Sequence, residues 1–171
     1  YIQRKLEQYG ITGRDAAGTP ISKTKPTLLL DAVASYLSSK SFSSYVWLLR
    51  HPDIQRFLPS QESAINDLDS YFNRHFPVRA TGNWLSTHPK DRNERLTANY
   101  QAVEELFGEL ISVQKKSLTN WIDELKTFLS TVYGASTFLP HLHETDRVLV
   151  ETFEQFLIVF ERCYRLPEDI L

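Results

Sequence analysis

The chain has 171 residues, of which 42% are hydrophobic and 23% are charged, a balance that is ordinary for a globular protein with a substantial core. Its formal net charge of -2 argues against a dedicated high-affinity nucleic-acid module, because such a module is usually strongly basic. The lone cysteine, Cys163, excludes an internal disulfide and a cysteine-rich zinc site, and it favours a reducing, cytoplasmic location. No apolar run approaches the roughly 18 to 20 residues that span a bilayer, so we expect no membrane partner.

The first residues predict a helix followed by a linker. Residues 1–9 show helical spacing of apolar side chains and end at Gly10, which is a common helix stop. Residues 11–24 contain two glycines and a proline and leave room for at most one short strand, near residues 11–22. Because the chain begins within a helical pattern and contains no methionine, we interpret it as a segment of a longer polypeptide; a trimmed complete protein is the alternative.

Two helices and a short helical turn are expected next. Thr24 and Pro26 mark a helix start, because proline fits the first helical turn. Ser41 starts a second helix, and Pro52 ends it, because the residue before a proline avoids helical geometry. A single turn of helix is predicted at about residues 54–58.

The middle of the chain predicts an amphipathic helix and then a long loop. Pro77 ends this helix, and residues 77–92, with two prolines and a glycine, form the loop. Trp84 and Leu85 are expected to anchor the loop on the core. The apolar stripe of the helix consists of Ile65, Leu68, Tyr71, Phe72 and Phe76.

The second half of the chain, residues 92–165, is predicted to supply the three longest helices. One helix runs through residues 96–113 without interruption. The next is capped by Ser117 or Thr119 and stops at Gly134.

The last helix covers residues 148–164, ahead of Pro167. Its segment 156–160 is apolar on nearly every side, which predicts that this helix is the central, buried one.

The opening third of the chain resembles a known family. It combines a helix that ends at Gly10, a G-x-P-x-x-x-T link at residues 18–24 and an L-R-H-P helix end at residues 49–52. This order resembles part of the second motor domain of UvrD-like superfamily-one DNA helicases, and most closely the AddB-like, partly inactivated helicase module of bacterial repair nucleases. The resemblance implies a non-catalytic helical segment that guides DNA or packs against other domains or subunits of a helicase–nuclease.

Few residues suggest catalysis or metal binding. The sequence lacks the glycine-rich phosphate loop G-x-x-x-x-G-K-[ST], so we predict no nucleotide hydrolysis, no catalytic residues and no cofactor. His141 and His143 could ligate a metal, which would suit a small metal-dependent hydrolase, but a third ligand is missing nearby and we predict no metal site. Cys163 lies on an apolar helix face and is expected to be an inert core thiol.

Basic residues form several loose clusters. Lys90, Arg92 and Arg95 share a loop region with Trp84, and an aromatic ring beside cations can stack a base while the cations grip phosphate. The competing interpretation is a solvated loop whose tryptophan folds inward. Another loose pair is formed by Arg74 and Arg79. The sequence Arg50-His51-Pro52-Asp53 is predicted to be a helix end rather than a phosphate contact.

Together these patterns predict an all-α protein, a compact bundle of about six or seven helices with at most one short strand near the N-terminus. Residues 1–58 would form a helicase-like N-terminal portion and residues 59–171 a helical bundle, or the whole chain would be one domain. The predicted function is that of a non-catalytic segment of an AddB-like protein that binds DNA weakly; the alternative is a stand-alone protein-interaction module.

Overall fold

A computed structural model of the chain describes residues 20–82, 84–87, 93–111, 117–134 and 144–166. Within these ranges the protein is all-α, with seven α-helices, short 3-10 helices and no sheet, as the sequence predicts. An isolated backbone bridge pairs Ser41 with Arg79. The helix expected at residues 1–9 lies outside the described residues, as does most of the possible strand, and Ile21–Lys23 form a 3-10 helix, η1.

Helices α2 (Lys25–Ser39), α3 (Phe42–Leu49) and α4 (Pro52–Gln55) follow one another closely. The N-terminus of α3 is capped by Ser41, whose side chain accepts a hydrogen bond from the backbone N–H of Ser44 at 3.1 Å. Pro52 does not merely end α3: it starts α4, because a proline needs no hydrogen-bond acceptor for its nitrogen in the first helical turn.

Helix α5 (Ala64–His75) is followed by a loop, the 3-10 helix η2 (Trp84–Thr87) and α6 (Glu94–Phe107). The helix expected over residues 96–113 is interrupted: α6 ends at Gly108, which has a φ of 46°, and the chain continues as a 3-10 helix, η4 (Gly108–Ile111). Glycine adopts this positive φ without the steric cost that a Cβ would add, so a single residue of the sequence, Gly108, favours the helix break.

Helices α7 (Leu118–Tyr133) and α8 (Glu144–Tyr164) complete the described chain. Ser117 caps α7 by accepting from the N–H of Asn120 at 3.2 Å, and Gly134 ends it. Among the described helices the three longest are α8 with 21 residues, α7 with 16 and α2 with 15, so the expectation that all three lie within 92–165 is wrong.

One continuous core connects the helices. Buried side chains from α2 to α8, for example Leu29, Leu58, Leu68 and Phe153, belong to a single hydrophobic cluster. This cluster runs across residue 58, where a boundary between two structural portions was predicted, and that division remains a prediction.

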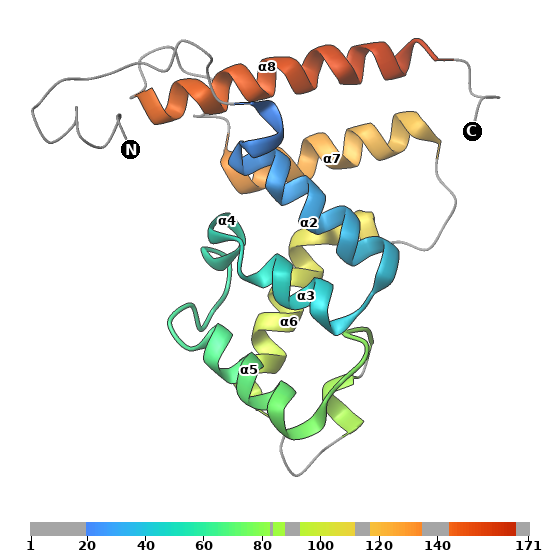
Figure 1. Cartoon of the computed structure of the whole chain (residues 1–171). Coiled ribbons are helices and arrows are strands. Elements are labelled where there is room, and N and C mark those ends of the chain that lie inside the picture. The colour runs from blue at the N-terminus through green and yellow to red at the C-terminus, as the bar shows by residue number, and fades with distance from the viewer. Residues whose placement is uncertain (1–19, 83, 88–92, 112–116, 135–143, 167–171) are drawn as a thin grey trace, which may run out of the picture.

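Figure 1 shows α8 at one end of the molecule, above α7 and the start of α2, with α5 and α6 toward the opposite end. The prediction that α8 is the central, buried helix is wrong, because Leu157, Ile158 and Val159 in its middle are exposed. An all-round apolar run usually indicates burial on every side. Here the described residues cover only the side of α8 that faces α7 and α2.

Candidate functional site

Among the described residues, one concave site lies between α7 and α8. Each helix contributes side chains spaced three or four residues apart, which lie on one face of that helix. The two faces meet across the site. The lining consists of Lys126, Leu129, Ser130, Tyr133 and Gly134 from α7 and its end, and Phe153, Phe156, Leu157 and Phe160 from α8.

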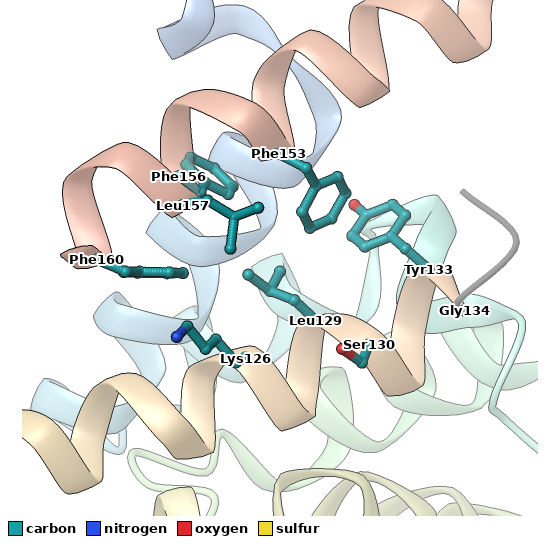
Figure 2. A pocket seen from close by; sticks show the side chains of 9 residues that line it. All are labelled: Lys126, Leu129, Ser130, Tyr133, Gly134, Phe153, Phe156, Leu157 and Phe160. Atoms are coloured by element: carbon teal, nitrogen blue, oxygen red, sulfur yellow. The ribbon is translucent and has the colours of Figure 1, made fainter. Parts of the chain in front are cut away.

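This α7–α8 groove has a volume of about 200 Å³, and Figure 2 shows its apolar side chains converging from the two helices. Phe153 meets Phe156 edge-on, with ring centroids 5.8 Å apart, and Phe160 continues the row 6.2 Å further along. Leu157, which also lines the groove, remains 42% exposed. Drug-sized ligands occupy pockets of about 300 to 1,000 Å³, whereas a cavity of about 150 Å³ holds a benzene-sized group. The groove therefore suits one or two apolar side chains.

A single cation stands at one end of the groove. The ammonium of Lys126 lies 4.5 Å from the centroid of the Tyr164 ring and 5.9 Å from that of Phe160. It donates a hydrogen bond of 3.1 Å to the Tyr164 hydroxyl, which in turn donates to the Asp123 carboxylate. No described carboxylate lies within ion-pair distance of Lys126, so its positive charge is balanced only indirectly. An incoming carboxylate would find a partner there.

A polar cluster around the largely buried Asp53 lies at the other end of the groove. Tyr133 donates a hydrogen bond of 2.8 Å to Asp53 of α4, which also pairs with Arg56 at 3.3 Å. Arg56 in turn donates to the backbone carbonyl of Val132 at 3.1 Å. Burial, and secondarily the hydrogen bond to Asp53, raises the pKa of Tyr133, so its hydroxyl remains protonated and acts as the donor.

The predicted DNA contact, formed by Lys90, Arg92, Arg95 and Trp84, is only partly covered by the described residues and stays a prediction. The Trp84 side chain is only 8% exposed and packs among aromatic rings, so the inward interpretation of this tryptophan is confirmed and its predicted stacking role would need the core to open. The Arg95 guanidinium pairs with Asp67 at 3.1 Å. Lys90 and Arg92 lie outside the described residues.

The other candidates are accounted for by local structure or lie outside it. His141 and His143 are outside the described residues, and among the residues that are described no group of three or more His, Cys, Asp and Glu side chains could hold a metal ion. Cys163 is half-buried near the end of α8. The described helices include none that is long and apolar enough to cross a membrane.

The Arg50–Asp53 segment is a helix junction. Arg50 pairs with Asp69 at 3.1 Å, and His51 caps α4 by accepting from the N–H of Asp53 at 3.3 Å. The other ring nitrogen of His51 lies 3.2 Å from the carbonyl oxygen of Lys25, to which it donates. The predicted role of this segment as a helix end accounts for all of these contacts.

The α7–α8 groove was not recognised in the sequence, although each of its halves was. The apolar residues of both helices were identified by their spacing, but spacing does not tell how far apart two helices lie. Lys126 was the available signal, because it places a cation on the same face as Leu129 and Tyr133.

Comparisons with models of protein families, with curated proteins and with solved structures found no match to this chain. The AddB-like resemblance of residues 1–58 therefore stays a prediction. The arguments for function that follow rest on the geometry of the described residues.

Proposed function

We propose that the chain is a non-catalytic helical module that binds another protein element through the α7–α8 groove. The observation that carries this proposal is the groove itself, an apolar slot of about 200 Å³ with one cation at its end. The partner is an amphipathic helix that inserts one or two apolar side chains and presents a carboxylate to Lys126.

The energetic reason is the apolar surface that α8 leaves uncovered. Leu157, Ile158 and Val159 lie next to one another in its middle and are exposed. Burying apolar area is worth about 25 cal/mol per Å², so a partner helix that covers the groove and the exposed part of Leu157 would gain binding free energy. The same contact would serve the packing of subunits in an AddB-like protein. The proposal is therefore compatible with both functions predicted from the sequence, an AddB-like segment and a protein-interaction module.

Weak DNA binding through Lys90, Arg92 and Arg95 has less support. Of its predicted cations, Arg95 is engaged with Asp67. We retain the cytoplasmic location as part of the proposal, because one unpaired cysteine suits a reducing compartment.

Fluorescent synthetic peptides test the proposal. Two amphipathic helical peptides carry the same leucine and phenylalanine face, one with glutamates and the other with lysines at the polar positions. We expect the glutamate peptide to bind more tightly, and Leu157→Glu to weaken its binding at least about tenfold, the loss of one well-packed anchor.

Leu28→Glu on α2 is the matched control, since Leu28 is also a leucine that is 42% exposed. Equal effects of the two substitutions, or tighter binding of the lysine peptide, would rule out the α7–α8 groove as the binding surface. Phosphate release from ATP by the purified chain, with or without DNA, would separately contradict the non-catalytic part of the proposal.

A further inference from the structure

A second surface lies on the side of α8 that faces away from the α7–α8 groove. Successive residues are turned by about 100° around an α-helix, so Ile158 points about 200° away from Phe156, which lines the groove. Ile158 is 42% exposed and Val159 beside it is 51% exposed. Figure 1 shows α8 at one edge of the molecule, with α7 and α2 together on its inner side. Among the described residues, nothing covers the middle of this outer face of α8.

Charged residues are ordered by sign along the outer face. Glu151 and Glu154 precede Ile158 by seven and four residues. Arg162 and Arg165 follow it by four and seven residues, Arg165 just past the last helical residue. All four are exposed, and residues at these spacings share one stripe of a helix. The stripe is therefore negative in its N-terminal half and positive in its C-terminal half, at mirrored distances from Ile158.

A two-fold axis at Ile158 would bring these charges into opposite pairs. If two antiparallel copies of α8 cross at this residue, Glu154 of one copy faces Arg162 of the partner subunit, because both lie about 6 Å from the crossing. Glu151 faces Arg165 of the partner subunit in the same way. Two parallel helices would instead place like charges together. A surface that complements itself under a two-fold rotation is what a symmetric dimer requires.

Part of this charge has no partner within the chain. In the described structure neither Glu154 nor Arg162 makes an ion pair, whereas Glu151 pairs with Arg147 at 2.9 Å. A hollow of about 290 Å³ lies between this part of α8 and the start of α2, and its lining includes Glu151, Glu154 and Thr24. The hollow gives guanidinium groups of a second copy room to approach both carboxylates.

We propose that the chain forms a homodimer in which the α8 helices of two copies pack antiparallel around Ile158. The contact does not depend on the function proposed for the α7–α8 groove, because it uses the opposite face of α8. An interface built from one helix of each copy is at or below the low end of specific interfaces, about 1,200 Å², so the dimer is weak and reversible. Salt screens its charge pairs and weakens it further.

Sedimentation equilibrium of the purified chain at low salt, up to near-millimolar concentration, tests the proposal. We expect a monomer–dimer equilibrium that Ile158→Glu weakens at least about tenfold, because the substitution places two carboxylates at the axis. Leu28→Glu is the matched control, since Leu28 on α2 is also 42% exposed, and it should leave the equilibrium unchanged.

Charge reversal tests the antiparallel order. Glu154→Arg and Arg162→Glu should each weaken the homodimer at least about tenfold, because the two-fold axis makes each substitution act twice. An equal mixture of the two variants should recover a dimer that contains one copy of each. In that mixed dimer, both pairs between positions 154 and 162 are again opposite in charge.

A chain that remains monomeric up to near-millimolar concentration would overturn the proposal. So would equal effects of Ile158→Glu and Leu28→Glu, a dimer that both charge reversals leave intact, or a mixture that stays monomeric. Ile158-dependent binding of a monomeric chain to phosphatidylcholine vesicles would overturn it in favour of a membrane surface.

Discussion

Trp84 shows how much one side chain organises in this protein. Its ring lies within 5.2 to 6.0 Å, between centroids, of Tyr71, Phe42, Tyr100 and Tyr45, which come from three helices. All four of these contacts are edge-on, an arrangement that aromatic quadrupoles favour. The loop after α5 is therefore anchored by packing.

His51 makes stability depend on pH. Burial lowers its pKa, as do Lys25 and Arg56 to a lesser extent, while Asp53 and the contact with the Lys25 carbonyl oppose the shift. His51 takes up a proton at a lower pH in the folded protein than in the unfolded chain, where the pKa of histidine is about 6.5. The contribution of His51 is therefore complete above that pH and is lost as the pH falls from there toward the lower folded pKa, by at most about 1.4 kcal/mol per pH unit.

Urea denaturation between pH 7.5 and about 5 measures this dependence. His51→Asn is the comparison, because asparagine keeps the cap of α4 and does not titrate. The stability of the variant should fall less steeply below pH 6.5. Parallel curves for the two proteins would assign the pH dependence to other groups.

Phe128 and Phe156 are matched probes of the core and of the groove. Phe128 is 3% exposed and lies 5.5 Å from Phe107, whereas Phe156 is half-buried and borders the α7–α8 groove. We expect Phe128→Ala to lower the free energy of unfolding by about 3 to 5 kcal/mol and Phe156→Ala to lower it by about half of that. The loss is smaller for Phe156 because part of its side chain already faces the groove, so its removal breaks fewer contacts. Chemical denaturation gives both values, and a larger loss for Phe156→Ala would show that the groove is filled in solution.

At the scale of elements, the short helix α4 depends on a polar connection to α7. Four residues provide too few backbone hydrogen bonds for an independent helix. The connection consists of Asp53, Tyr133 and Arg56, and Asp53 is largely buried. The same contacts place the Tyr133 ring at the end of the α7–α8 groove.

A double-mutant cycle measures this connection. Tyr133→Phe and Asp53→Asn, alone and together, should give a coupling energy of about 0.5 to 3 kcal/mol, because each substitution alone disturbs the same buried hydrogen bond. The free energies of unfolding in urea provide the numbers. Strictly additive losses would mean that the Tyr133–Asp53 hydrogen bond does not couple α4 to α7.

At the scale of the whole molecule, the pairing of charges decides which cations can act on DNA. Arg95 is held by Asp67, whose carboxylate is itself mostly shielded from water. We therefore expect Arg95→Ala to leave the salt slope of weak DNA binding unchanged, and Asp67→Asn to steepen it by about 0.7 for a single strand.

Titration of oligothymidylate binding against salt checks both variants. Ser63 donates a hydrogen bond to Asp67 at 3.0 Å, so Ser63→Ala serves as a control for local disturbance of this segment. A flatter slope for Arg95→Ala would return Arg95 to consideration as a DNA contact.

The sequence determined the helical class of this protein and most of its helix ends. Ser41, Ser117 and Gly134 act where local hydrogen bonding predicts, because caps depend on neighbours only a few residues away. Gly108 could also have been read as a break, since its positive φ is a property of one residue. These features need no knowledge of the fold.

Only the tertiary structure decided which surfaces are covered. The periodicity of α8 shows that segment 156–160 is apolar, but whether an apolar side chain is buried depends on what packs against it. The pairing of Arg95 with Asp67 and the contact of Tyr133 with Asp53 join residues 28 and 80 positions apart in the chain. Such contacts arise from the packing of helices against one another, which no local pattern specifies.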